Sequence, residues 1–337
     1  MRPFKYTSAK TAATAIQSAV LNKNARFLAG GTNLVDLMKE DVERPDELID
    51  ISGLKLTAVE KILIGLNSGG VSIGGLGKNT ETANHPIIRK EFPLLTQAIL
   101  AGASAQIRNM ATNGGNLLQR TRCPYFYDVA MPCNKRQPGT GCGAMEGFSR
   151  MHAIVGWSEK CVAVHPSDMC IALAALDAVV KVQGPNGKKR SIPFADFHRL
   201  PGDTPEKDNN LEAGELITAI EIPENNFAGK SYYLKIRDRA SYAFALVSVA
   251  AALETTGDTI VRVNIALGGV AHKPWRAFEA EKFLAGKTVS EANFKKAAEI
   301  EMQAAKPLEQ NKFKVDMCIL AITHALTKAV KGTKASL

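Results

Sequence analysis

The chain has 337 residues, with 42 Lys or Arg against 33 Asp or Glu, so its formal net charge is +9. Hydrophobic residues make up 45% and charged residues 22%, a mix that is typical of a globular protein and excludes a disordered chain or a fibre. The length predicts two domains. The longest apolar runs, such as residues 243–253, are too short to span a bilayer, and residues 1–15 lack the apolar centre of a signal peptide. We therefore expect a cytoplasmic protein whose mild basicity suits an anionic ligand or an acidic partner.

The first two thirds of the chain alternate short helices and strands. Thr7 or Ser8 can cap a first helix, in which apolar residues recur at helical spacing from residue 12 to residue 20. Residues 184–187, Gly-Pro-Asn-Gly, predict a hairpin turn. The further elements expected here are strands near residues 26–29, 47–51, 71–73, 179–182 and 190–192, and helices near residues 34–39 and 93–100.

A domain boundary is predicted at residues 223–226, Pro-Glu-Asn-Asn, because the pattern changes beyond it. Strands are expected there over residues 231–236, 244–253 and 260–267, and helices over residues 276–285, 290–304 and 308–330. Strands followed by helices predict an α+β lobe. We assign residues 1–223 to a first domain and residues 228–332 to a second.

Two glycine pairs have the local pattern of a phosphate-binding turn. Residues 29–34, Ala-Gly-Gly-Thr-Asn-Leu, connect a buried strand to a helix, and residues 112–117, Thr-Asn-Gly-Gly-Asn-Leu, repeat the theme. Glycine lets backbone N–H groups approach an anion closely, and a helix N-terminus adds partial positive charge. The two loops could hold one phosphate each of a dinucleotide; alternatively, each is only a tight turn. Neither matches the Rossmann fingerprint or the P-loop.

Four of the six cysteines fall in one turn-rich segment, residues 119–164. Cys123, Cys133, Cys142 and Cys161 are spaced C-x9-C-x8-C-x18-C, without the close pairs of structural zinc sites. A [4Fe–4S] cluster takes four thiolates and tolerates irregular spacing, whereas zinc, two disulfides or free thiols are the alternatives. Cations of the segment could offset the negative charge of a cluster; they are Arg120, Arg122, Lys135, Arg136 and Arg150.

The other two cysteines, Cys170 and Cys318, lie in apolar helical patterns and are expected in the core. The six histidines are dispersed along the chain, and we expect no metal-ligand pairing among them.

At this point a family resemblance becomes specific. Residues 29–39, AGGTNLVDLMK, and residues 112–118, TNGGNLL, resemble the two flavin-diphosphate loops of the FAD-binding subunits of molybdenum hydroxylases, which include xanthine dehydrogenase, carbon monoxide dehydrogenase and aldehyde oxidoreductases. Further matches run in family order through nearly the whole chain, at residues 165–168, 214–223, 235–251 and 265–281. This chain departs from the common family pattern in residues 119–164. In the common subunit, a short connection joins the second loop to the Ser-Asp motif.

The resemblance implies an FAD-binding fold of the vanillyl-alcohol-oxidase (PCMH) type with two N-terminal subdomains, followed by an α+β C-terminal lobe of antiparallel sheet and helices. Asp168 would bind a sugar hydroxyl of FAD, Ile217 would touch the adenine end, Lys235 would lie near the flavin, and Leu118 would lie beside the isoalloxazine ring. The remaining residues would contact the diphosphate and its neighbours: Phe27, Leu28, Ala29, Gly30, Gly31, Thr32, Asn33, Leu34, Thr112, Gly115 and Asn116. Without the family, each has a structural alternative, such as a helix cap for Asp168. The first loop has no His or Cys to attach flavin covalently, so we expect dissociable FAD.

The run QRTRCPYFYD with the following PCNKR resembles the aldehyde-oxidoreductase version of this subunit, in which an insertion holds an extra [4Fe–4S] cluster. The resemblance therefore implies four cysteine ligands, at positions 123, 133, 142 and 161. It also implies a heterotrimer, with a large molybdopterin subunit that oxidises the aldehyde and a small subunit with two [2Fe–2S] clusters. No residue of this chain would act on substrate; electrons would reach its FAD and then an external acceptor. Export with a signal-bearing partner is the alternative to a cytoplasmic location.

Three rival functions are kept. The first is the corresponding subunit of a 4-hydroxybenzoyl-CoA reductase or a xanthine dehydrogenase-like complex. The second, of another class, is a zinc-stapled scaffold without redox function. The third is a stand-alone flavin oxidase.

Overall fold

The computed structural model describes residues 1–332. The N-terminal subdomain is a three-stranded parallel sheet in the order β1-β3-β2, formed by β1 (Lys5–Ser8), β3 (Glu47–Asp50) and β2 (Ala25–Leu28). Helices α1 (Ala12–Leu21) and α2 (Leu34–Lys39) complete it. The expected cap was wrong: Thr11 caps α1, because Thr7 and Ser8 belong to β1 and pair with β3.

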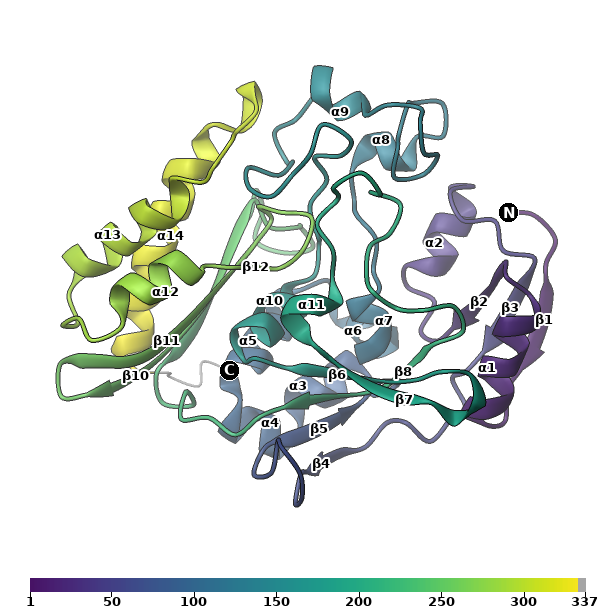
Figure 1. Cartoon of the computed structure of the whole chain (residues 1–337), viewed down its shortest axis with the longest axis horizontal. Helices are drawn as coiled ribbons and strands as arrows, with labels where there is room; N and C mark the ends of the chain where they lie inside the picture. The colour runs from purple at the N-terminus through teal and green to yellow at the C-terminus, as the bar shows by residue number, and fades with distance from the viewer. Residues whose placement is uncertain (333–337) are drawn as a thin grey trace.

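The second subdomain is built on a five-stranded antiparallel sheet (Figure 1). Its strand order is β4 (Val59–Lys61), β5 (Val71–Gly74), β8 (Leu216–Ile222), β6 (Val179–Gln183) and β7 (Lys189–Pro193). Its helices are α3 (Asn79–Asn84), α4 (Pro86–Glu91), α5 (Pro93–Ala101), α6 (Ala105–Met110), α7 (Asn113–Leu117), α10 (Asp168–Ala175) and α11 (Phe194–Phe197). The expected strands and the hairpin near residues 184–187 are confirmed, with η1 (Pro185–Gly187) in the turn.

Between α7 and α10 the chain leaves this subdomain and forms the top of the molecule in Figure 1. This cysteine segment, residues 119–164, contains two helices of four residues each, α8 (Pro124–Tyr127) and α9 (Gly143–Glu146). The rest is irregular backbone, as expected from its Pro and Gly content.

The C-terminal lobe carries a four-stranded antiparallel sheet in the order β12-β11-β10-β9. Its strands are β9 (Ser231–Ile236), β10 (Val247–Thr256), β11 (Thr259–Gly268) and β12 (Trp275–Arg276). Its helices are α12 (Phe278–Leu284), α13 (Glu291–Met302), η2 (Glu309–Asn311) and α14 (Phe313–Val330). The expected three long strands followed by three helices are confirmed, although β10 begins three positions later than expected, at Val247.

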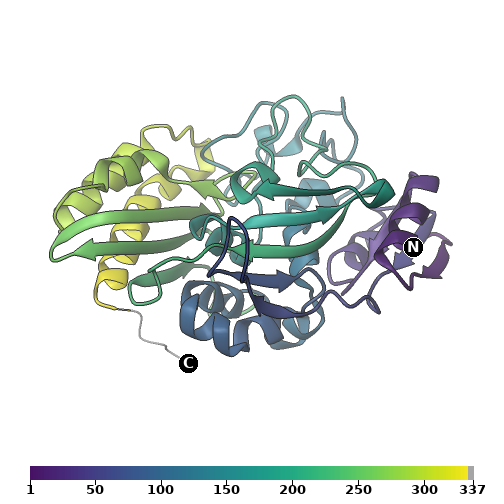
Figure 2. The ribbon, with the colours of Figure 1, turned by 60° about the horizontal axis from the view of Figure 1, so that its bottom comes forward.

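The central strand β10 is buried on both faces because it lies between two hydrophobic cores. Ala250 and Ala252 join the core of α5, α10 and the five-stranded sheet, whereas Val249 and Leu253 join the core of α12–α14. Figure 2 shows the two N-terminal subdomains and the C-terminal lobe in a row, with the five-stranded sheet in the middle. Within residues 1–332, no helix is both long and apolar enough to cross a membrane.

Candidate functional site

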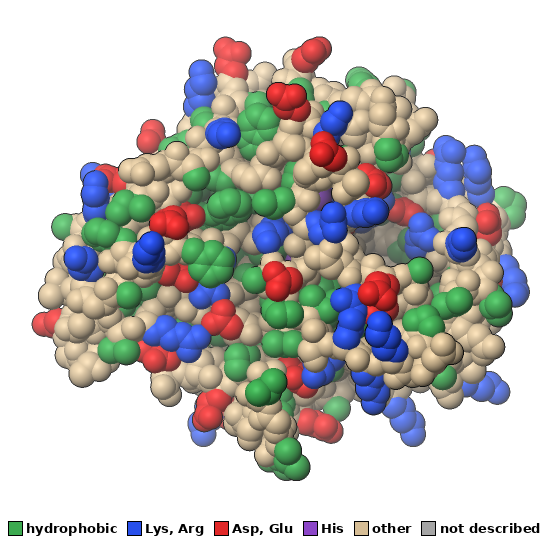
Figure 3. Space-filling model, viewed as in Figure 1, with side chains coloured by type: hydrophobic (Ala, Val, Ile, Leu, Met, Phe, Trp, Pro, Cys, Tyr) green, Lys and Arg blue, Asp and Glu red, His purple; other side chains and the backbone are tan. Residues whose placement is uncertain are grey.

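A cavity of about 570 Å³ lies where the two N-terminal subdomains meet the C-terminal lobe. Of the expected flavin-binding residues, those that line it are Thr32, Asn33, Gly115, Asn116, Asp168 and Lys235. They come from the starts of α2, α7 and α10 and from β9. We call this cavity of about 570 Å³ the cleft. Figure 3 shows Lys and Arg side chains spread over one face of the molecule, several of them beside a hollow on the side of the N-terminal subdomain.

The first glycine loop leaves backbone N–H groups without hydrogen-bond partners. A Cβ atom on Gly30 would lie 2.1 Å from the carbonyl oxygen of Met110, and Gly31 has a φ of 71°, so both positions require glycine. In the described part of the chain, the backbone N–H groups of residues 30–33 have no hydrogen-bond partner. Beside them, the side-chain Nδ2 of Asn33 is buried without a partner, while its Oδ1 accepts from the backbone N–H of Arg120 at 2.9 Å. Such unsatisfied donors suit a phosphate.

The second loop is closed by its own hydrogen bonds. Thr112 caps α7, with its hydroxyl accepting from the N–H of Gly115 at 3.2 Å and its carbonyl accepting from the N–H of Asn116 at 2.8 Å. The N–H of Gly114 donates to the carbonyl of Gly75 at 2.7 Å. The two glycine pairs are therefore similar in sequence but differ in their hydrogen bonds. The N–H groups of the second loop are already bonded, so this loop can offer a ligand only close contact with its backbone and the side chain of Asn116.

Asp168 and Lys235 form a buried ion pair across two lobes. Lys235 Nζ lies 2.7 Å from Asp168 Oδ2, and the Tyr233 hydroxyl donates to Asp168 Oδ1 at 2.7 Å. Ser167, not Asp168, caps α10, by accepting from the N–H of Cys170 at 3.0 Å. Burial, with the neighbouring Asp168 charge, raises the pKa of Tyr233 well above its usual value. The pair joins β9 to α10 at the cleft wall.

The other expected flavin residues do not line the cleft. Ile217 is 4% exposed in the hydrophobic core, where its side chain faces Gly114, and Leu118 ends α7 with 39% of its surface exposed. Residues 27–31, Leu34 and Thr112 flank the lining residues without lining the cavity themselves.

Sequence reasoning missed the arginines of the cleft. Arg108, Arg122 and Arg239 all line it, and neither Arg108 nor Arg239 has a carboxylate partner in residues 1–332. Arg122 is paired with Asp36 at 2.9 Å and also lies 5.3 Å from the centre of the Phe244 ring. Their positions are far apart in the sequence, so only the +9 net charge hinted at a basic, anion-binding site.

All four cysteines of the cysteine segment line one pocket, together with Lys135 and Asn134. All four are free thiols, and Cys133 and Cys161 are buried. Within residues 1–332, the single compact group of three metal-ligating side chains lies elsewhere, so no three of these cysteines form such a group. Four thiols are the number of protein ligands that a [4Fe–4S] cluster takes.

Nearby backbone N–H groups act to lower the pKa of two of the cysteines. Those of Tyr125 and Phe126 favour the thiolate form of Cys123, and that of Ala163 favours the thiolate form of Cys161. Burial nevertheless raises the pKa of Cys123 to about 12 and that of Cys161 to about 11. Without a metal these groups are therefore protonated thiols, and ligation would release their protons.

Of the five cations that could offset the charge of a cluster, four are paired with carboxylates. Arg120 binds Glu43 and Asp208, Lys135 binds Asp208, and Arg122 binds Asp36. Arg150 pairs with Asp238, and Arg136 donates to backbone carbonyls of the segment. Of the five, Lys135 still acts on a cysteine, since its charge favours the Cys161 thiolate.

A small cavity of about 140 Å³ connects the cysteine pocket to the cleft. Cys123, alone among the four cysteines, lines it. The cavity shares six residues with the cleft wall: Arg122, Met151, Pro166, Ser167, Asp168 and Phe244. The two expected cofactor sites are therefore neighbours.

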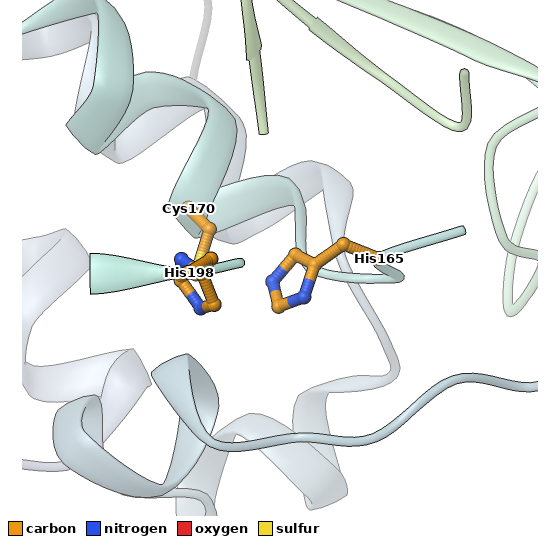
Figure 4. A group of neighbouring side chains, drawn as sticks. All are labelled: His165, Cys170 and His198. Atoms are coloured by element: carbon orange, nitrogen blue, oxygen red, sulfur yellow. The ribbon is translucent and has the colours of Figure 1, made fainter. Parts of the chain in front are cut away.

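The absence of metal-ligand pairing among the histidines stays a prediction, although two of them meet in the fold. The rings of His165 and His198 lie beside Cys170, with ring centres 4.4 Å apart and planes tilted by 55°, and the three potential ligand atoms lie within 4.8 Å of one another (Figure 4). Burial lowers the pKa of His198 to about 4 and that of His165 well below its usual value. His198 packs against Phe194 and Phe197, so this group is part of the core. The expected burial of Cys170 and Cys318 is confirmed.

Residues 2–225 match the family described as the FAD binding domain in molybdopterin dehydrogenase, and residues 232–328 match the CO dehydrogenase flavoprotein C-terminal domain. The chain therefore belongs to the FAD-binding medium subunits of the molybdenum hydroxylase family, and it is an oxidoreductase subunit. This confirms the family resemblance and the α+β fold class.

Among its relatives, the chain is 49% identical over 331 residues to the aldehyde oxidoreductase FAD-binding subunit PaoB of Escherichia coli (strain K12), covering 98% of this chain and 99% of that protein. It is 30% identical over 288 residues to the glyceraldehyde dehydrogenase medium chain of Sulfolobus acidocaldarius, covering 86% and 83% of the two chains. A solved carbon monoxide dehydrogenase chain from Hydrogenophaga pseudoflava superposes with a TM-score of 0.76 at 24% identity, covering 98% and 99%, which shows a shared fold.

Proposed function

We propose that this chain is the FAD- and [4Fe–4S]-containing electron-transfer subunit of a molybdenum-dependent aldehyde oxidoreductase. The observation that carries the proposal is the shared wall between the cleft and the cavity of Cys123, because it brings two redox sites together in one chain. The 49% identity to an aldehyde oxidoreductase FAD-binding subunit supports the substrate class.

The cleft fits FAD by its donors. The free N–H groups of Thr32 and Asn33 and the buried Asn33 Nδ2 would hold the diphosphate, and Arg108 and Arg239 would supply positive charge. Asp168 would accept from a sugar hydroxyl, and Gly115 and Asn116 would form the facing wall. FAD, when bound, supplies the redox chemistry, while this chain binds and orients it.

The cysteine pocket fits a [4Fe–4S] cluster by the number of its donors and by their free thiols, with Cys123, Cys133, Cys142 and Cys161 as the ligands. The insertion boundaries, 119–164, and the domain boundary at residues 223–226 stay predictions.

The partners would be a large molybdopterin subunit and a small subunit with two [2Fe–2S] clusters. Substrate would be oxidised on the large subunit, and electrons would leave through this chain to an external acceptor. A cytoplasmic location, or export with a signal-bearing partner, also stays a prediction.

The test is to purify the chain with and without a large molybdopterin subunit and a small [2Fe–2S] subunit from the same source. The complex should oxidise aldehydes and bleach the flavin, whereas the full chain alone should bind FAD, be reduced by dithionite and leave aldehydes untouched. Aldehyde turnover by the chain alone would contradict the proposal. A complex that acts on 4-hydroxybenzoyl-CoA or xanthine but not on aldehydes would replace the substrate class.

A further inference from the structure

One side chain reaches a sulfur of the cysteine pocket from outside the four-cysteine set. His152 Nε2 lies 3.1 Å from Cys123 Sγ, and the residue is 2% exposed. Its ring lies 6.3 Å, centre to centre, from that of Tyr125, and both His152 and Cys123 line the small cavity beside the cleft. The histidine therefore contacts the one cysteine that faces the flavin side.

The position of His152 is imposed by the C-terminal lobe. Its carbonyl accepts from Lys314 Nζ at 3.0 Å and from Asn311 Nδ2 at 3.2 Å, and both of these side chains are fully buried. Lys314 Nζ also donates to the carbonyl of Gly269 at 2.7 Å. Because two bonds from the C-terminal lobe hold the carbonyl of His152, the contact between ring and sulfur does not depend on the irregular segment alone.

We propose that His152 is a positioning residue that donates a hydrogen bond from Nε2–H to the Cys123 sulfur and so raises the reduction potential of the cluster. The inference rests on the proposed function. An iron-bound thiolate has no proton and can only accept, so the ring nitrogen must donate. Nδ1 of His152 has no partner in residues 1–332, which suits a ring whose single proton is on Nε2.

The direction of the effect follows from charge. Reduction adds one electron, and part of the added negative charge falls on the thiolates. A fixed N–H dipole directed at a sulfur stabilises that charge, in the way that hydrogen bonds to sulfur set cluster potentials generally. His152 keeps its proton in both states, so no proton transfer accompanies the electron.

The experiment compares the midpoint potential of the cluster in the full chain with that of His152→Leu, which keeps the size but removes the donor. We expect unchanged iron content and an equilibrium for reduction about tenfold less favourable, which is about 59 mV for one electron. His152→Gln, which keeps an N–H group, should recover most of the shift. Tyr125→Phe is the control: its hydroxyl accepts from the N–H of Phe148, so its loss should leave the potential unchanged.

A second readout does not depend on a stable Leu variant. In the parent chain labelled with ¹⁵N-histidine, pulsed paramagnetic resonance of the reduced protein should show a histidine coupling that His152→Gln removes. Equal potentials in the parent and the Leu variant at full iron content, or no histidine coupling, would overturn the role of His152 and leave the proposed function standing. A parent chain without iron would overturn both.

Discussion

The cleft and the cysteine segment are held together in different ways. The cleft is walled by the ends of regular elements and tied by a buried ion pair between Lys235 and Asp168, so the protein itself sets its shape. The cysteine segment has two four-residue helices, and side chains such as Asn134 and Arg136 hold its loops by bonding to backbone groups. We therefore expect the cleft to form without its ligand, and the cysteine segment to depend on the cluster proposed for its four sulfurs.

The largest expected effect is at a cysteine of the pocket. Cys133→Ser removes a buried thiol that we propose as a cluster ligand, so the iron content of the chain should fall from about four to near zero. Because the segment has little regular structure, it should also become sensitive to protease, while FAD is retained at least in part. Iron and sulfide analysis with limited proteolysis measures both. A Ser variant with full iron would contradict the contrast between the two regions.

A substitution in the cleft, by comparison, should weaken FAD binding while the chain stays folded. A Cβ on Gly115 meets only the Thr112 hydroxyl, at 2.8 Å, so Gly115→Val fills the cleft and costs the chain at most this helix cap, about 1 kcal/mol. We expect FAD affinity to fall at least about tenfold, or about 1.4 kcal/mol, by fluorescence titration. Gly53→Val, at a site with no atom within 4 Å, is the control. Full FAD occupancy in the Gly115 variant would show that this loop does not face the cofactor.

Breaking the ion pair between Asp168 and Lys235 tests whether this pair stabilises the cleft in the absence of a ligand. Asp168→Asn leaves the charge of Lys235, whose side chain is 4% exposed, without its counter-ion. Such a change costs about 3–5 kcal/mol in the free energy of unfolding. The exposed pair Asp41–Arg44 gives the control, Asp41→Asn, which should lower the free energy of unfolding far less because solvent screens the two charges. Similar small losses for both variants in urea unfolding would argue against the assigned role of the buried pair.

Buried histidines should make the core beneath the cleft sensitive to acid. Burial lowers the pKa of His198 and of His272 to about 4, whereas the unfolded value is about 6.5. The unfolded state therefore binds more protons between these values, so stability is complete above pH 6.5 or so and falls as the pH falls toward 4. His198→Phe should flatten this dependence in unfolding measurements made across the range. A parent chain whose stability is constant there would contradict the buried, neutral state of these rings.

The smallest effect is expected at the two core cysteines. Cys170→Ala and Cys318→Ala remove only packing contacts, at a cost of about 1–2 kcal/mol, and should leave iron unchanged. Loss of iron from either variant, as large as that from Cys133→Ser, would mean that the pocket has been assigned to the wrong thiols.

The sequence predicted those helices and strands whose bounds depend on neighbouring residues in the chain. Helix α2 and strand β9 were predicted at their observed bounds, because a glycine turn or a domain boundary precedes each apolar run. Strand β1 was missed because most of its residues are exposed and show no apolar alternation. The pairing of Asp168 with Lys235, the arginines of the cleft and the contact of His152 with Cys123 join residues that are far apart in the sequence, so only the folded chain brings them together.

The most direct test of the central claim is the cofactor content of the purified full chain, prepared without partner subunits and without air. The account predicts about one FAD and about four irons with equal sulfide per chain, and a paramagnetic signal of a single four-iron cluster after reduction. Zinc in place of iron, or FAD with no iron at all, would contradict it.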